Sequence, residues 1–195
     1  MELRDKLVER FGSQNVVDVV QAEEHQIDLV EIRVQKRSEV TLLMTQGLSE
    51  YFMPVLPKHK GQERIELYFC LPSYWDLDDR ENPRMNWVIT WLNKLVKHVR
   101  EKETWYGVGH TIPAGTPLKQ LSETMKQSYF FMNAPDFVKE ELTPIEFEDK
   151  KVHFLAVIPM FEDEFDYKMG KGTYKFLQKL ELKRVTELLD DYRST

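Results

Sequence analysis

Short apolar runs rich in β-branched residues occupy the first half of the chain, and one of them alternates loosely with polar residues. Such runs are typical of β-strands. Turn-forming residues end two of them, at Gly47 and at Pro72. The pattern predicts four strands in this part of the chain, at residues 16–20, 29–34, 40–45 and 65–71.

The clearest predicted element is a helix that follows Asn82 and Pro83. Asparagine is a good N-cap, and proline suits the first helical position, where the missing N–H has no partner in any case. The apolar residues that follow recur at helical spacing and form one stripe, which we expect to face the core. The stripe consists of Val88, Trp91, Leu92, Leu95 and Val99.

The two ends of the chain also show the helical period. Helices are predicted at residues 3–11, 162–169, 172–182 and 185–192, and two further strands at residues 128–132 and 152–158. The strands have few helices between them, so a purely parallel βαβ sheet is not expected. We therefore predict a single α+β domain over residues 1–195, with a mainly antiparallel or mixed β-sheet packed by helices.

Composition narrows the class of protein. Of the 195 residues, 42% are hydrophobic and 31% are charged, which is typical of a globular chain and unlike a disordered or membrane protein. The net charge of −6 argues against sequence-independent binding to nucleic acid. The N-terminal segment lacks the apolar stretch of a secretory signal, and no apolar run is long enough to span a bilayer, so we expect a cytoplasmic protein that is not bound to a membrane.

Candidate catalytic and metal-binding groups are few. The single cysteine, Cys70, excludes an intrachain disulfide and a cysteine-based zinc site, and we expect it to be a small core residue. The histidines lack the spacing of a metal site. The acidic residues 76–79 lack the glycine and the glutamate of a calcium loop, so we expect them to lead into the N-terminus of the following helix. No nucleophile–base set, cofactor or metal is predicted.

His110 differs from the other histidines because it lies in a loop rich in glycine and proline, residues 107–117, shortly after Trp105. Loops of this kind often carry binding residues. A hydrogen bond that braces the loop would explain His110 equally, and the sequence leaves both roles open.

Acidic residues are concentrated between positions 136 and 166, where ten acids and three lysines give a net charge of −7. Four of these acids form the cluster Glu162, Asp163, Glu164 and Asp166. The cluster suits a docking surface for a basic partner. Carboxylates at this place would also favour the N-terminus of their own helix through its dipole, and both interpretations stay open.

Several motifs resemble those of bacterial suppressor-of-fused-like proteins, and they occur in the same order. They are Thr45–Ser49, Ile65–Pro72, Trp105–Pro113, Phe154–Pro159 and Val185–Asp190. The resemblance runs from about Leu29 to the C-terminus. Two positions depart from it, since Leu48 stands where methionine is expected and Ala114 where asparagine is expected.

The resemblance implies a non-enzymatic protein-binding module. The animal protein binds a transcription factor of Hedgehog signalling by clamping an extended peptide between two lobes as an added β-strand, and this chain has the length of the N-terminal lobe alone. Bacterial members of the family are thought to include immunity proteins, which neutralise a partner toxin by direct binding. We therefore expect a protein partner, such as a basic toxin domain, and no nucleic acid.

The residues assigned to partner binding are Trp75, Trp105, His110, Glu162, Asp163, Glu164 and Asp166. The alternative function is a small-molecule-binding domain or an enzyme whose pocket is built from the His110 loop and the Trp75 segment. A deep pocket lined by His110, Trp105 and carboxylates would favour this alternative, whereas a broad exposed face would favour protein binding.

Overall fold

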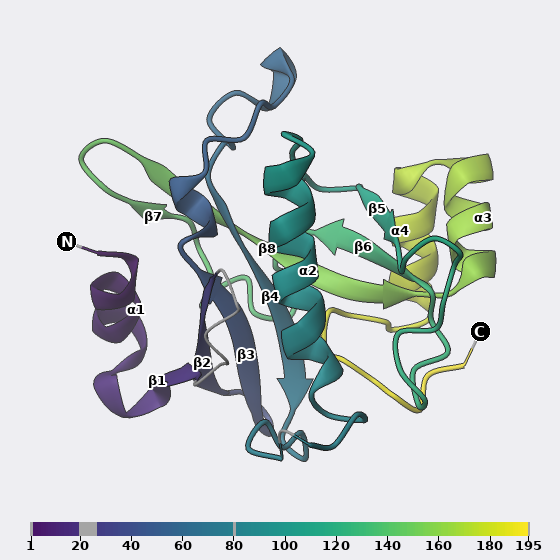
Figure 1. The fold of residues 1–195 in the computed structure, drawn as a ribbon, viewed down its shortest axis with the longest axis horizontal. Helices are drawn as coiled ribbons and strands as arrows, with labels where there is room; N and C mark the ends of the chain where they lie inside the picture. Colours follow the sequence, from purple (N-terminus) through teal and green to yellow (C-terminus); the bar gives the residue numbers. More distant parts are fainter. Residues whose placement is uncertain (1, 20–26, 80, 195) are drawn as a thin grey trace.

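A computed structural model describes residues 2–19, 27–79 and 81–194 of the chain, and it contains a mixed β-sheet with helices on both faces (Figure 1). The strands are β1 (Val16–Val19), β2 (Asp28–Gln35), β3 (Glu39–Gln46), β4 (Ile65–Pro72), β5 (Thr111–Pro113), β6 (Tyr129–Asn133), β7 (Ile145–Glu146) and β8 (Lys151–Met160). Their order is β1-β2-β3-β4-β8-β6-β5, and β7 pairs with β8. Only the β4–β8 pairing is parallel among the described strands, which confirms the predicted mixed α+β fold.

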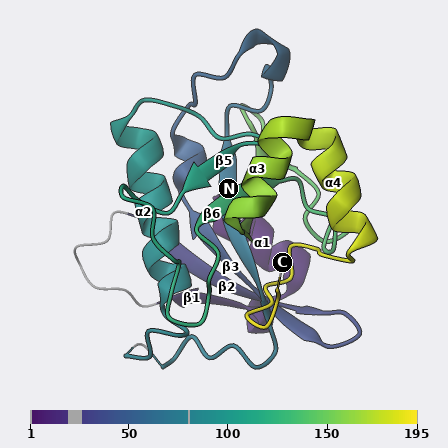
Figure 2. The ribbon, with the colours of Figure 1, turned by 90° about the vertical axis from the view of Figure 1, so that its right-hand side faces the viewer.

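The helices are α1 (Leu3–Phe11), α2 (Trp87–Glu101), α3 (Glu162–Lys171) and α4 (Thr173–Leu182). Helix α2 covers one face of the sheet, and the other three helices pack on the opposite face (Figures 1 and 2). The predicted strand at residues 16–20 is found as β1, and Val20 lies outside the described residues. The predicted loop at residues 107–117 contains the short strand β5.

Strand β4 lies at the centre of the sheet and is buried along nearly its whole length. Because successive side chains of a strand point to opposite faces, β4 contributes to both cores. Leu67 and Phe69 pack with α2, whereas Tyr68 and Cys70 belong to the core beneath α1 and α4. The prediction that Cys70 is a small core residue is confirmed.

Helix α2 carries the predicted apolar stripe, but it begins four residues later than the sequence indicated. The side chain of Asn82 accepts a hydrogen bond from the Arg84 N–H at 3.0 Å, which closes a turn ahead of the helix. The carbonyl of Met85 accepts a hydrogen bond from the indole of Trp75, so it is already engaged before the helix starts. The first turn of α2 contains no acidic residue, so the expectation that residues 76–79 lead directly into it is wrong.

The predicted helix at residues 185–192 is absent from the described structure. Helix α4 stops because Arg184 adopts a left-handed conformation (φ 55°) and Val185 N–H bonds back to the Leu180 carbonyl at 2.9 Å. The chain then forms a parallel bridge beside Cys70, whose carbonyl accepts a hydrogen bond from Leu189 N–H at 2.8 Å. Long-range pairing therefore replaces the local helical period.

The motif that follows β3 is a turn held by a buried carboxylate, Glu66. Its two oxygens accept hydrogen bonds from the N–H groups of Gly47, Leu48 and Ser49 at 3.0–3.2 Å and from the Thr45 hydroxyl at 2.5 Å. Gly47 has φ +109°, a conformation that side chains other than glycine rarely adopt. Full burial raises the pKa of Glu66, and the hydrogen bonds oppose that rise because they favour the ionised carboxylate.

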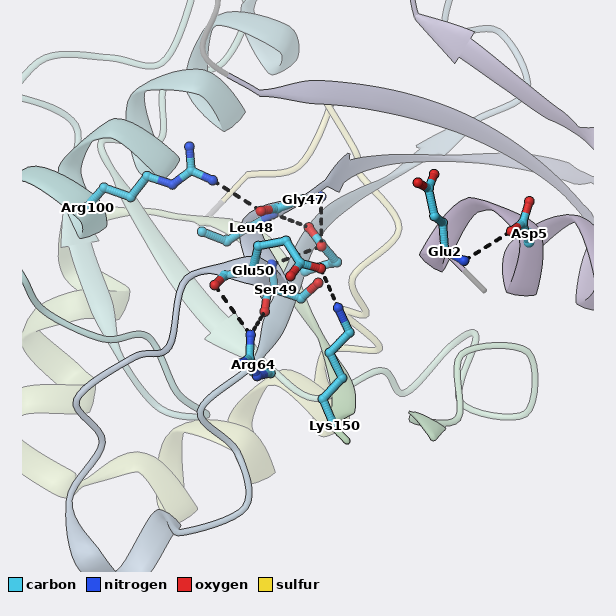
Figure 3. Close-up of polar contacts among 10 residues, drawn as sticks. Glu2, Asp5, Gly47, Leu48, Ser49, Glu50, Arg64, Arg100 and Lys150 are labelled. Atoms are coloured by element: carbon cyan, nitrogen blue, oxygen red, sulfur yellow. Dashed lines mark hydrogen bonds and ion pairs between the residues drawn. The ribbon is translucent and has the colours of Figure 1, made fainter. Parts of the chain in front are cut away.

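Three cations surround the same turn (Figure 3). Arg100 donates to the Gly47 carbonyl at 3.1 Å, Arg64 donates to the Ser49 carbonyl at 2.8 Å, and Lys150 pairs with Glu50. These contacts tie the turn to α2, β4 and the β7–β8 hairpin. The motif therefore has a structural role in joining four elements.

Candidate partner-binding surface

Trp75, which the sequence assigned to partner binding, is a core residue. Its side chain is only 7% exposed and packs edge-on against Trp87 at 6.0 Å between ring centroids. Its indole N–H donates to the Met85 carbonyl at 3.0 Å. Trp75 therefore positions the segment before α2 and does not reach the surface that carries the other predicted residues.

Trp105 and His110 form a half-buried aromatic cluster together with His59. The ring of His110 lies edge-on to Trp105 at 4.2 Å, and His59 contacts the same indole at 4.9 Å. Gly107 makes this packing possible, because a Cβ at that position would lie 2.5 Å from the Trp105 ring. Trp105 and His110, which the sequence assigned to partner binding, therefore lie side by side.

The surroundings of His110 lower its pKa and so favour the neutral imidazole. Burial lowers the pKa of His110, and the positive charges of His59, Lys168 and Lys58 lower it further. A hydrogen bond with the Trp105 backbone opposes these effects in part, which fits the loop-bracing role that the sequence left open. A neutral imidazole beside an indole is suited to packing and hydrogen bonding with a partner.

A hollow of about 380 Å³ adjoins this cluster. Its lining comprises His98, Thr104, Trp105, Tyr106, Gly109, His110, Thr111 and Ile112. No carboxylate is among these described residues, and Trp75 does not line the hollow. The hollow therefore differs from the pocket of His110, Trp105 and carboxylates that the alternative function predicts.

Strand β5, which begins directly after His110, is the edge strand of the sheet. Thr111, Ile112 and Pro113 pair with β6 on one side, and no described strand pairs with the other side. Edge strands present unpaired backbone groups that can bond to another chain, although Pro113 lacks an N–H and shortens the usable edge. The sequence pattern missed this strand because glycines and prolines surround its β-branched residues.

Three members of the acidic cluster occupy the first turn of α3 and Asp166 lies in the second, and the four differ in role. Glu162, Asp163 and Asp166 are exposed. Glu164 is 2% exposed, accepts the Phe161 N–H at 3.0 Å and pairs with Arg193 at 2.8 Å. Glu164 is therefore a buried structural carboxylate, and the expectation that it belongs to an exposed docking surface is wrong.

Helix α3 runs beside the β5–β6 edge (Figure 2). Tyr129 of β6 pairs with Pro113, and its ring stacks on Phe165 of α3 at 4.2 Å. Burial raises the pKa of Tyr129, and the nearby carboxylates of Glu162 and Asp166 add to the rise. The acids thus lie close to the β5–β6 edge.

The His110 loop meets the other end of α3, because Gly109 packs against Thr173 at the start of α4. A helix of ten residues spans about 15 Å, so the aromatic cluster and the acids lie near opposite ends of α3. We call the region between them the β5–α3 face. It is defined by Trp105, His110, Thr111–Pro113, Tyr129, Phe165, Glu162, Asp163 and Asp166.

The described residues contain neither a metal-binding cluster nor a membrane-spanning helix. No group of three or more histidine, cysteine, aspartate or glutamate side chains in this part of the chain could hold a metal ion. No helix of the described residues is long and apolar enough to cross a membrane.

Comparisons with known proteins agree with this architecture. The fold is similar to that of a chain in the crystal structure of the Sufu–Fu complex (16% identity, TM-score 0.69, covering 98% of this chain and 90% of that one). It is also similar to a putative suppressor of fused homolog from Neisseria gonorrhoeae (11% identity, TM-score 0.61, covering 98% and 95%). Drosophila suppressor of fused matches over 92% of this chain, which spans 46% of the Drosophila chain (15% identity, TM-score 0.64).

No curated protein sequence matches this chain. The family model described as suppressor of fused protein (SUFU) matches residues 23–194, which is most of the sequence. The order of motifs from Thr45 to Asp190, strands β2 to β8 and helices α2 to α4 all lie within this match. The chain therefore belongs to the suppressor of fused (SUFU) family.

Proposed function

We propose that this chain is a non-enzymatic, cytoplasmic protein-binding module that acts as a bacterial immunity protein. It neutralises a basic toxin domain by binding it directly through the β5–α3 face. Family membership supports a protein partner, since a chain with this fold is part of the Sufu–Fu complex. The similar fold of a homolog from Neisseria gonorrhoeae supports a bacterial setting.

The exposed acids of α3 carry this proposal. Glu162, Asp163 and Asp166 lie on one helical turn and a half, beside an aromatic pair and a free strand edge. Their negative potential attracts a basic partner over distances of about 8–10 Å at physiological salt. Charges at the rim of an interface mainly accelerate association, so these residues steer the encounter.

The rest of the face supplies the contacts that hold the complex. Trp105 and His110 offer half-buried rings, and aromatic residues of this kind often dominate binding energy at interfaces. The edge of β5 can pair with an extended segment of the toxin. Binding of this kind neutralises an enzyme by covering its active site or its substrate-binding surface, without any reaction on the immunity protein.

The alternative of a small-molecule or catalytic pocket at the His110 loop has less support. The hollow beside His110 lacks a carboxylate, and the core position of Trp75 removes one of the two segments expected to form the pocket. His110 has no neighbouring acid among the residues that line the hollow.

The proposal is tested by capturing partners from the native host with the wild-type chain and with the variant E162Q/D163N/D166N. A captured basic toxin is then expressed with and without the immunity protein, and growth of the host is measured. We expect the wild-type chain to restore growth. Stopped-flow measurements should show that the variant associates several-fold more slowly at low salt, since it lacks the steering charges.

The variant E140Q/E148Q/D149N is the matched control, because it removes three exposed acids elsewhere. Two of them lie in the β7–β8 hairpin, on the side of the molecule opposite α3 (Figure 1). It should associate like the wild type. Equal association rates for both variants would refute the β5–α3 face, and captured proteins that include no toxin relieved by this chain would refute the immunity function.

A further inference from the structure

A hollow lies where β4 and β8 part, at their carboxyl ends. The two strands pair only as far as Tyr68 and Ala156. Beyond these residues β4 remains paired with β3, and β8 remains paired with β6. The carboxyl ends of β4 and β8 therefore separate (Figure 1). The hollow has a volume of about 640 Å³, and Pro72 of β4 and Pro159 of β8 both line it.

This location is a topological switch point. Strands β4 and β8 are parallel neighbours, but β4 leads to α2 on one face of the sheet whereas β8 leads to α3 on the other. In open sheets with parallel strands, ligands bind in the crevice outside the carboxyl ends at such a point. The hollow meets this condition and lies apart from the Trp105–His110 cluster.

The C-terminal segment, residues 183–194, forms the outer wall of the hollow and is fixed along its length. Leu189 bonds to β4 through the Cys70 carbonyl, and the Tyr74 hydroxyl donates to Asp191 at 2.6 Å. Glu187 is 3% exposed and accepts hydrogen bonds from three successive N–H groups, residues 136–138, at 2.7–3.2 Å. The wall is therefore rigid, and the hollow is preformed.

Gln127 gives the hollow an unused polar group. Its side chain lines the hollow although the residue is only 2% exposed. Within the described part of the chain, its amide makes no side-chain hydrogen bond. A carboxamide offers both a donor and an acceptor to a ligand in the hollow. A ligand with a peptide group would satisfy both at once.

The other lining residues indicate the polarity and the charge of the ligand. Met125, Ile158 and the two prolines give apolar walls. The lining charges balance in number once Arg193 is paired with Glu164, because two cations, Lys183 and Arg184, match two anions, Glu187 and Asp190. The bridge between Leu188 and Cys70 shows that the end of β4 already accepts an extended chain.

We propose that this hollow is a second binding site, which takes an uncharged, extended peptide segment of a partner protein. One apolar side chain of that segment packs against Met125 and Ile158, and an adjacent peptide group pairs with the Gln127 carboxamide. The site goes beyond the toxin-binding function, since it uses none of the residues of the β5–α3 face.

N-acetyl-leucinamide is a suitable probe, because it joins one apolar side chain to two peptide-like amides. It is titrated into the full-length ¹⁵N-labelled chain while the side-chain NH₂ signals of Gln127 are followed by NMR. We expect saturable shifts of these signals and of the backbone signals of Ile158 and Thr186, with millimolar affinity. N-acetyl-glycinamide, which lacks the apolar side chain, should bind more weakly.

The variant Q127M keeps a side chain of similar length without the carboxamide, and it should weaken binding about tenfold. The control Q120M changes an exposed glutamine and should bind like the wild type. A second variant, T186W, fills the hollow from its wall and should abolish the Ile158 shifts even where Q127M perturbs packing. The proposal would be overturned by the absence of saturable shifts at Gln127, or by an affinity equal to that of the wild type in both Q127M and T186W. Either result would leave the toxin-binding test unaffected.

Discussion

The turn after β3 and the N-terminal half of α3 both contain carboxylates, but these side chains have opposite roles in the two places. At the first, Glu66 is turned inward onto three backbone N–H groups and a hydroxyl. At the second, Glu162, Asp163 and Asp166 point outward, and only Glu164 is turned inward, onto the Phe161 N–H and Arg193. A glutamate thus serves the fold where buried donors surround it and is free for a partner where none do.

The comparison also explains why an acidic stretch is ambiguous in sequence. Glu162 and Glu164 are two residues apart, so on a helix they point in very different directions. One is exposed and the other is nearly completely buried. The net charge of the stretch therefore overestimates the charge that a partner can meet.

The largest expected effect comes from E66Q. The amide replaces one accepting oxygen by a donor that faces backbone N–H groups, and it removes the negative charge from a fully buried site. Charged hydrogen bonds contribute about 1.5–3 kcal/mol each, so we expect a loss of about 3–5 kcal/mol in the free energy of unfolding. Chemical denaturation measures it, and E50Q, which changes an exposed carboxylate on the same turn, should lose less than about 1 kcal/mol.

E164Q should have the next largest effect. It leaves the buried guanidinium of Arg193 without its anionic partner, and we expect a loss of about 2–3 kcal/mol. Thermal unfolding of E164Q beside E162Q separates the inward from the outward carboxylate of one helical turn. Equal melting temperatures for these two variants would contradict the contrast drawn between them.

The smallest expected effect is a pH dependence of stability that arises from two half-buried histidines, which are cations when protonated. Burial lowers the pKa of both His110 and His153. Between these lowered values and the unfolded value near 6.5, the unfolded chain binds more protons, so stability falls as the pH falls. We expect the free energy of unfolding to decrease from about pH 7.5 to about pH 5.5, and less steeply in H110Q/H153Q.

A double variant whose stability changes with pH as steeply as that of the wild type would show that carboxylates, and not these two histidines, dominate in this range.

Local patterns of the sequence predict much of the sheet and the interior of α2. The strands at residues 29–34, 40–45 and 65–71 and the stripe through Leu92 and Leu95 follow from side-chain periodicity alone, because neighbours in sequence determine which face is apolar. The ordered motifs indicated the family, which the family match confirms. Trp91 lies on the stripe but is only half-buried, beside Phe130 and beneath the Lys94 ammonium group.

Of the candidate site, the sequence indicated Trp105, His110 and the acids at the start of α3. It could not place Trp75 in the core or turn Glu164 inward, since each outcome depends on a partner distant in sequence or on the packing around it. Gln127 gave no signal, because an uncharged polar residue becomes informative only when its surroundings are buried.

The conformation of the C-terminal segment is determined by tertiary contacts and not by its local sequence pattern. Its apolar residues at 185–192 fit a helix, and the sequence by itself determines that spacing. The tertiary structure overrides it, because Glu187 satisfies three N–H groups about fifty residues away and Leu189 completes a hydrogen bond to the end of β4. Residues close in sequence determine the periodicity. Buried backbone N–H and C=O groups need hydrogen-bond partners, and which groups are buried depends on how distant segments pack together.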